Sequence, residues 1–160
     1  MGFSAGGHLV GLLGALWDQP WLAESISASP ESIRPDTLCL GYPVVSSGAY
    51  AHRGSFEHLT GADGALAQNL SIENMVGDGF PRTFLWHTAE DASVPVQNSL
   101  LLAQALADHG IGFSLHVFSH GKHGASLATD QTAFKGCAEH IQPQVQGWPE
   151  QFVAWERDGR

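Results

Sequence analysis

The pattern GFSAGG at residues 2–7 constrains this chain more than any other feature of its sequence. A serine with a glycine two positions away on either side is typical of a sharp strand-to-helix turn, where larger side chains would clash across the strained backbone. Residues 5–18 follow at once and carry apolar side chains at helical spacing. This helix would direct its first N–H groups and its dipole at Ser4, which suits a nucleophile whose reaction develops negative charge on an oxygen.

Three strands are expected after that helix, of which the first two are expected to be buried. Residues 37–45 (TLCLGYPVV) and 83–87 (TFLWH) are nearly continuous apolar runs, and residues 113–118 form a third candidate strand. Continuous apolar runs are typical of parallel strands that are covered on both faces.

Two further helices are expected in the second half of the chain. Residues 95–109 predict a helix closed by Gly110, and residues 144–155 predict a last helix that Pro149 must either kink or start. Strands that alternate with helices indicate βαβ units. We therefore expect an α/β fold with about three parallel strands and helices on both faces of the sheet.

The remaining segments are expected to be less regular. Residues 19–36 predict a loop with one short helical turn. Residues 46–81 predict an irregular insert with helical stretches near residues 55–59 and 65–70. At 160 residues the chain is expected to form a single domain, residues 1–160, that carries this insert.

Acidic and histidine residues follow two of the predicted strands. Glu90 and Asp91 lie in the loop after the second strand, and His120 and His123 lie in the loop after the third. A serine nucleophile needs a base, and the base needs an acid to orient it. Because the carboxyl ends of parallel strands meet at one edge of the sheet, we expect Ser4, one acid and one histidine to lie close together there.

Several stretches of the chain resemble the esterase and acetylesterase branch of the α/β-hydrolases, whose members include acetyl xylan esterase-like and feruloyl esterase-like enzymes. The stretches that carry the resemblance are GFSAGGHL, LGYPVVSS, GSFEHLTG, LSIENMV, PRTFLWHTAEDASVPVQNSLLLAQAL and HVFSHGKHGASLA. They run over nearly the whole chain.

The resemblance implies a role for four residues. Ser4 matches the nucleophile, Asp91 matches the acid of the HTAED loop, and His123 matches the base of the HGKHG loop. The backbone N–H of Ala5 matches one donor of the oxyanion hole. The motif positions therefore favour Asp91 over Glu90, and His123 over His120.

The chain also departs from the family pattern. The family places several strands before the nucleophile turn, together with an HGG-type loop that supplies a second oxyanion donor, and neither is found here. We therefore expect the chain to correspond to the carboxyl-terminal part of an α/β-hydrolase fold, beginning at the nucleophile turn and lacking the amino-terminal strands. The strand at residues 37–45 would then have an unpaired apolar edge.

The resemblance implies a serine carboxylester hydrolase that acts on short-acyl esters, such as acetyl esters, of sugars or small alcohols, without a cofactor. Two alternatives remain open. The chain could be a truncated and catalytically incompetent hydrolase that forms a homo-oligomer, or pairs with a partner, through the open sheet edge. The weaker alternative is a serine peptidase of the prolyl oligopeptidase type, because a fold does not determine a substrate.

Composition excludes several other classes of protein. The formal net charge is −9, and the seven Lys and Arg residues are scattered, which argues against binding to nucleic acid or to an anionic membrane. Cys39 and Cys137 are predicted to be free thiols, and the histidines show no metal-ligand spacing. His8 and His87 are expected to be packing or core histidines.

A targeting segment is not expected. The apolar stretch at residues 8–17 has no basic residue before it and no small-residue cleavage site after it, so we do not interpret it as a signal peptide. The expected location is the cytoplasm.

Overall fold

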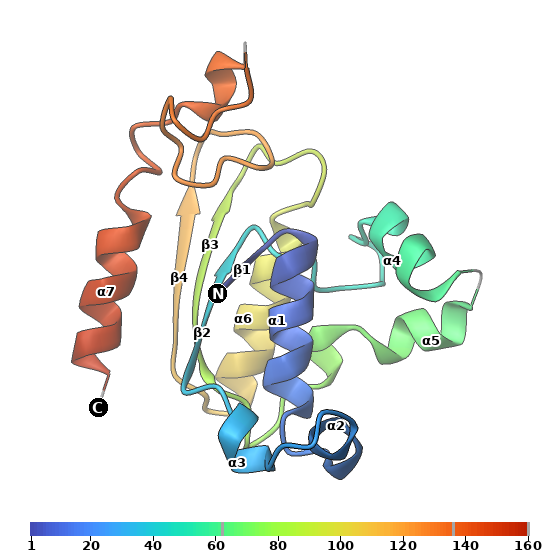
Figure 1. The fold of residues 1–160 in the computed structure, drawn as a ribbon. Coiled ribbons are helices and arrows are strands. Elements are labelled where there is room, and N and C mark those ends of the chain that lie inside the picture. The colour runs from blue at the N-terminus through green and yellow to red at the C-terminus, as the bar shows by residue number, and fades with distance from the viewer. Residues whose placement is uncertain (62, 136, 160) are drawn as a thin grey trace.

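The computed structural model describes residues 1–61, 63–135 and 137–159 of the chain (Figure 1). Its centre is a parallel sheet in which the four strands lie in chain order, β1-β2-β3-β4. The strands are β1 (Gly2–Phe3), β2 (Thr37–Gly41), β3 (Arg82–Thr88) and β4 (Phe113–Phe118). The predicted parallel sheet is confirmed, with one strand more than the sequence indicated.

Helices lie on both faces of this sheet, as expected. Figure 1 shows α7 on one face and α1 with α6 on the other. The helices are α1 (Ala5–Leu16), α2 (Pro20–Ser25), α3 (Pro30–Ile33), α4 (Arg53–Thr60), α5 (Gly64–Asn69), α6 (Gln97–Asp108) and α7 (Trp148–Asp158), with 3₁₀ turns η1 (Ile72–Asn74) and η2 (Ala138–His140).

The core is divided between the two faces by the alternation of side chains along the strands. Leu38, Leu40 and Leu85 pack in the cluster that includes residues of α1 and α6. Cys39 and Phe84 point the other way and pack in the cluster that includes residues of α7. Successive side chains of a strand face opposite sides, so a strand buried on both faces needs the continuous apolar sequence seen at residues 37–41.

Several predicted boundaries were wrong, each for a local reason. β2 ends at Gly41 rather than at residue 45, because Tyr42 has a positive φ of 37° and leaves the extended conformation. The last helix begins at Trp148 rather than at residue 144, with Pro149 in its first turn. Proline therefore starts this helix and does not kink it.

The segments that were expected to be irregular contain more helix than predicted. Residues 19–36 contain α2 and α3, and each of these short helices begins at a proline. The insert at residues 46–81 contains α4 and α5, which confirm the two helical stretches expected near residues 55–59 and 65–70, and also η1. These helices have too few turns to produce a clear apolar period in the sequence.

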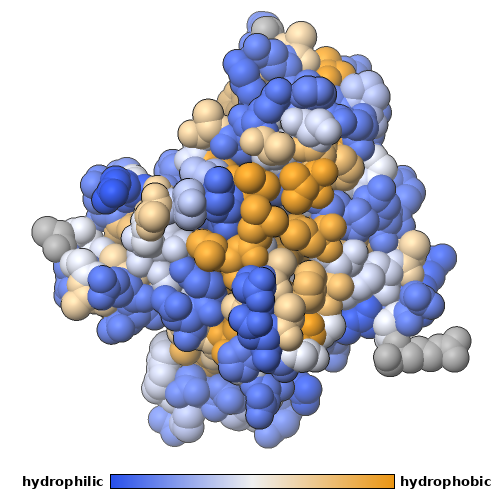
Figure 2. Space-filling view, turned by 180° about the vertical axis from the view of Figure 1, so that it is seen from behind, coloured by the Kyte–Doolittle hydropathy of each residue, from blue (hydrophilic) through white to orange (hydrophobic). Residues whose placement is uncertain are grey.

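The edges of the sheet are only partly covered within the described residues. β1 pairs with β2 at Leu40 and Gly41, so Thr37 to Cys39 have no strand partner on that side in the described sheet. β4 pairs with β3 and with no other described strand. Figure 2 shows a band of hydrophobic side chains down the middle of the face seen from behind.

No helix in the described part of the chain combines the length and the hydropathy that crossing a membrane requires.

The glycines in the first turn of α1 provide a matched test of this packing. A Cβ on Gly7 would lie 2.7 Å from Cβ and 3.0 Å from Cα of Pro43, whereas a Cβ on Gly6 would have no atom within 4 Å. We expect Gly7→Ala to lower the free energy of unfolding by about 1–3 kcal/mol through overpacking. Gly6→Ala should leave it unchanged or raise it by up to about 1 kcal/mol.

Urea denaturation of the two variants measures both effects. Equal stability of Gly6→Ala and Gly7→Ala would contradict the close approach of α1 to the loop that follows β2.

Candidate active site

Ser4 lies in a strained turn between β1 and α1. Its φ of 54° and ψ of −124° are unusual for a residue other than glycine. The Ser4 N–H donates to the Gly41 carbonyl (3.1 Å), and the Ser4 carbonyl accepts from the N–H groups of Val44 (3.1 Å) and His8 (3.2 Å). A Cβ on Gly2 would overlap the Gly6 carbonyl, so the expected clash holds at position 2, but a Cβ on Gly6 would meet no atom within 4 Å, so the clash expected there is wrong.

The imidazole of His123 lies against this serine. His123 is in the loop after β4, and its Nε2 is 2.7 Å from Ser4 Oγ. The side chain of His123 is 22% exposed, so solvent reaches the site. The Tyr42 ring packs edge-on against the imidazole, with ring centroids 5.0 Å apart.

The carboxylate of Asp91 holds the other side of the imidazole. Asp91 is in the loop between β3 and α6, and its Oδ2 is 2.7 Å from His123 Nδ1. The other oxygen, Oδ1, accepts from the backbone N–H groups of Ser93 and Val94, each at 2.9 Å. Because a carboxylate only accepts, Nδ1 of His123 carries a proton, and Nε2 is left to accept from the Ser4 hydroxyl.

The environment of Asp91 stabilises its ionised form. Burial alone raises the pKa of the Asp91 carboxyl, but hydrogen bonds from His123, His87 and the Val94 N–H outweigh it and hold the pKa well below its usual range. A charged carboxylate at this position can orient the imidazole and stabilise its protonated form.

Glu90 and His120, the other candidates for the acid and the base, pair with each other. His120 Nδ1 is 2.8 Å from Glu90 Oε1, and the two side chains are 67% and 59% exposed. The structure thus links Ser4, His123 and Asp91 in one hydrogen-bonded chain. Glu90 and His120 form a separate surface pair between the same two loops.

Known proteins match this chain in sequence and in structure. Residues 64–139 match the prolyl oligopeptidase family. The chain is 40% identical over 137 residues to endo-1,4-beta-xylanase B of Butyrivibrio fibrisolvens, an alignment that covers 82% of this chain and 21% of that protein. It is 29% identical over 136 residues to the acetylxylan esterase of Xylanibacter ruminicola, covering 81% and 26% respectively.

Solved structures match over nearly the whole chain. The carboxylesterase Cest-2923 from Lactobacillus plantarum superposes with a TM-score of 0.81 at 30% identity, over 98% of this chain and 56% of that one. An acetyl ester-xyloside bifunctional hydrolase from Caldicellulosiruptor lactoaceticus superposes with a TM-score of 0.79 at 41% identity, over 98% and 54% respectively.

The chain belongs to the α/β-hydrolase superfamily. Its fold is a partial α/β-hydrolase fold, and the solved structures that it matches are esterases and related hydrolases. It spans about half the length of these solved structures and 21–26% of the curated relatives that it matches.

Ala5 opens α1 directly after the serine of this α/β-hydrolase. The first N–H groups of a helix have no carbonyl partner within the helix, and they carry the positive end of its dipole. The position of Ala5 at the start of α1 is consistent with the oxyanion donor that the sequence predicts, and this role stays a prediction.

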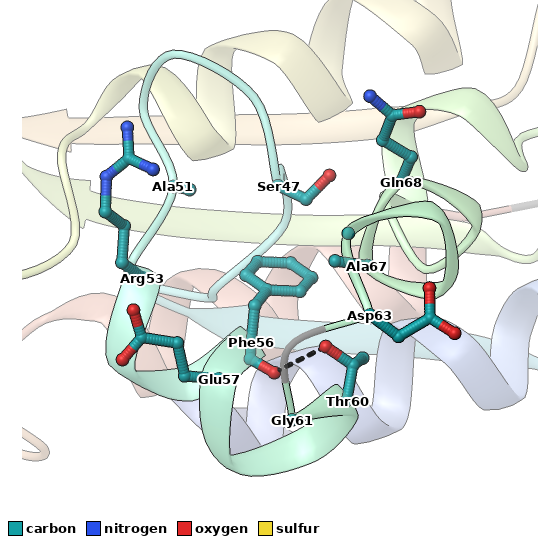
Figure 3. A pocket seen from close by; sticks show the side chains of 11 residues that line it. Ser47, Ala51, Arg53, Phe56, Glu57, Thr60, Gly61, Asp63, Ala67 and Gln68 are labelled. Atoms are coloured by element: carbon teal, nitrogen blue, oxygen red, sulfur yellow. Dashed lines mark hydrogen bonds between the residues drawn. The ribbon is translucent and has the colours of Figure 1, made fainter.

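Two cavities adjoin the elements around the site. One, of about 390 Å³, lies between α1 and α4 and is lined by Ala5, His8, Leu9, Leu12, Ser55, His58 and Leu59. The other, of about 410 Å³, is lined by residues of α4, α5 and the loop before them. Figure 3 shows the Phe56 ring in the middle of this second cavity, with Arg53 and Glu57 to one side and Asp63 and Gln68 to the other.

His8 packs beside the first cavity. Its Nε2 is 2.8 Å from the Leu70 carbonyl oxygen, and its ring lies edge-on to Phe56 with centroids 5.3 Å apart. Burial lowers the pKa of His8. The expected packing and hydrogen-bonding role of His8 is confirmed.

Asn98 supports the site but was not singled out by the sequence. It is buried in α6, where its Oδ1 accepts from the N–H groups of Val45 (2.9 Å) and Ser46 (3.0 Å). Its Nδ2 donates to the carbonyls of Tyr50 and Pro95. The side chain therefore fixes the loop after β2 onto α6, and nothing in the local pattern around Asn98 indicates these distant partners.

Among the residues that the structure describes, no group of three His, Cys, Asp or Glu side chains is placed to hold a metal ion.

The lowered pKa of Asp91 predicts how stability depends on pH. A carboxyl whose pKa is lower in the folded than in the unfolded state stabilises the fold above its unfolded value, about 3.9, and loses that contribution as the pH falls toward the folded value. We therefore expect wild type to be more stable than Asp91→Asn at pH 6, and this difference to shrink as the pH falls below about 4.

Urea denaturation of both proteins across this pH range measures the difference. A difference that stays constant or grows below pH 4 would contradict the hydrogen bonding assigned to Asp91.

Proposed function

We propose that this chain acts as a serine carboxylester hydrolase on short-acyl esters, such as acetyl esters, of sugars or small alcohols. The observation that carries the proposal is the hydrogen-bonded chain from Ser4 Oγ through His123 to Asp91, with both links at 2.7 Å. The names of two matched proteins, an acetylxylan esterase and an acetyl ester-xyloside bifunctional hydrolase, support the substrate class.

The geometry suits an acyl-enzyme mechanism. His123 Nε2 takes the proton of Ser4 Oγ while this oxygen forms a bond to the ester carbonyl carbon. The tetrahedral intermediate collapses when the bond to the alcohol oxygen breaks, and His123 gives its proton to the departing alcohol. His123 then removes a proton from water as the water oxygen forms a bond to the acyl carbon. The bond between this carbon and Ser4 Oγ breaks, His123 returns the proton to Ser4 Oγ, and the carboxylic acid leaves. These steps need no cofactor.

The proposal gives two further groups a role at the transition state. The Ala5 N–H donates to the carbonyl oxygen as negative charge develops on it, and loss of one such donor costs on the order of a hundredfold or more in rate. Asp91 holds His123 in the productive tautomer and stabilises the imidazolium.

The cavity between α1 and α4 offers room for the acyl or alcohol part of an ester. It reaches Ala5 and is lined by apolar side chains together with the polar residues His8, Ser55 and His58. The insert that carries α4 would then shape the substrate pocket, and variants of Leu59 would change which acyl lengths are accepted.

Hydrolysis of p-nitrophenyl acetate, butyrate and octanoate tests the proposal. We expect the acetate to be hydrolysed fastest, and Ser4→Ala, His123→Gln and Asp91→Asn each to lower kcat by about a thousandfold or more. Glu90→Gln is the matched control for Asp91→Asn and should change kcat less than about threefold.

Three outcomes would overturn the proposal. They are no hydrolysis by the wild-type chain, activity that survives in Ser4→Ala, and equal losses of activity in Glu90→Gln and Asp91→Asn.

A serine peptidase is the second candidate, because residues 64–139 match the prolyl oligopeptidase family. The same triad can attack an amide, so the geometry of Ser4 and His123 does not separate the two reactions. A proline-containing peptide p-nitroanilide, assayed beside the acetate ester, separates them. A higher kcat/KM on the peptide than on the ester would favour the peptidase.

A further inference from the structure

His87 is a buried histidine that touches the acid of the candidate triad. It lies near the end of β3, four residues before Asp91, and its side chain is fully buried. Its Nε2 is 2.9 Å from the Val94 carbonyl oxygen and 3.4 Å from Asp91 Oδ2. Its Nδ1 is 2.8 Å from Ser99 Oγ in α6.

These partners determine the tautomer of His87. A carbonyl oxygen only accepts, so Nε2 of His87 carries a proton and donates it to Val94. Nε2 is also 3.4 Å from Asp91 Oδ2, so the carboxylate is a second and more distant contact of the same nitrogen. In the neutral ring Nδ1 has a free lone pair, which accepts from the Ser99 hydroxyl and opposes a flip of the imidazole.

We propose that His87 is a positioning residue for Asp91: its Nε2–H, directed by Ser99, holds the acid loop closed and aims Asp91 Oδ2 at His123. The proposal rests on the proposed function, in which Asp91 orients the base. It extends the hydrogen-bonded chain beyond Asp91 to β3 and α6.

The loop geometry explains why such a residue is needed. Asp91 lies in the irregular segment between β3 and α6, and its Oδ1 is held by two backbone N–H groups of its own loop. Because both donors belong to the loop that carries Asp91, these two bonds do not fix the carboxylate relative to the sheet. His87 is anchored in a central strand, and it contacts both the acid and Val94, the residue that closes the loop.

The charged surroundings leave this role to His87. Among the described residues, the histidines that stabilise the ionised carboxylate are His123 and His87. Tyr42, whose ring packs edge-on against His123, is close enough for the Asp91 charge to help raise the pKa of its hydroxyl, and it does not contact the carboxylate through a hydrogen bond among those described. Removing a side chain that contacts a catalytic group without touching the substrate typically costs 10–100-fold in activity at metal sites, and we expect a similar size here.

The test compares His87→Leu, which has no N–H donor, with His87→Gln, whose amide can donate near the position of Nε2. Ser99→Ala removes the partner that directs the ring, and is the variant to use if His87→Leu does not fold. His116→Leu is the control, because it makes the same substitution at a histidine of the neighbouring strand β4, which is partly buried and lies outside the triad.

Two readouts are needed for each variant. The first is the proton NMR signal of His123 Nδ1–H, which a strong hydrogen bond to a carboxylate shifts far downfield and protects from exchange. The second is the steady-state hydrolysis of p-nitrophenyl acetate across pH, which gives kcat and KM separately.

We expect His87→Leu to lose the His123 signal and to lower kcat by about 10–100-fold with little change in KM. Ser99→Ala should broaden the signal and lower kcat less, while His87→Gln should keep the signal and lie within about threefold of wild type. The acid limb of the pH–rate profile should move to lower pH in His87→Leu, because a displaced carboxylate stabilises the imidazolium less.

An unchanged signal and kcat in folded His87→Leu or in Ser99→Ala would overturn the proposal. A loss of the same size in His87→Gln as in His87→Leu would also overturn it, because the donor would then not matter. If the wild-type chain hydrolyses no ester, the proposed function fails, and the NMR signal of the same variants still decides the role of His87.

Discussion

The left-handed backbone of Ser4 determines the geometry of the whole candidate site. Three hydrogen bonds, to Gly41, Val44 and His8, hold this strained residue between β1 and α1. They connect the turn to the end of β2 and to the first turn of α1. If Ser4 relaxed to an ordinary conformation, its hydroxyl would leave the imidazole of His123, so the packing of α1 on the sheet directly supports the chemistry.

The candidate site also depends on the negative charge of Asp91. Asp91 is buried, which would raise its pKa, yet donors on both carboxylate oxygens hold it ionised. They come from its own loop, from the loop after β4 and from β3, so the charge of one side chain joins three segments of the fold. The exposed pair of Glu90 and His120 joins the same two loops but faces water, where an ion pair contributes little to stability.

Much of this arrangement could be predicted from the sequence. Residues 83–87 were identified as a strand because a parallel strand buried on both faces leaves a continuous apolar run. Residues 113–118 form a partly exposed strand whose aromatic and β-branched residues still favour the extended conformation. β1 was missed as a paired strand because two residues carry no periodic pattern. β2 was predicted too long because Val44 and Val45 belong to the loop after the strand and are nevertheless buried, and an apolar sequence does not distinguish a strand from a packed loop.

The residues of the site, like the elements of the fold, could be predicted only in part from the sequence. Chain order pointed to Ser4 with one acid and one histidine, and the resemblance to the esterases then favoured Asp91 and His123. The structure brings these three side chains together. The contacts of His87 and Asn98 could not be predicted, because they depend on ring and amide orientations toward partners on other elements. The sequence shows only that His87 precedes Asp91 by four residues at the end of a predicted strand. Whether the two side chains meet depends on how the loop after the strand folds, and the structure brings them together.

Mass spectrometry of the intact chain after treatment with a fluorophosphonate tests the central claim most directly. This probe bonds to a serine only when a working base activates it, so it reports the assembled site without any assumption about the substrate. The structure predicts one adduct on the wild-type chain and none on Ser4→Ala. An unmodified wild-type chain, or an adduct that persists in Ser4→Ala, would contradict the claim that Ser4, His123 and Asp91 form a functional site in this chain.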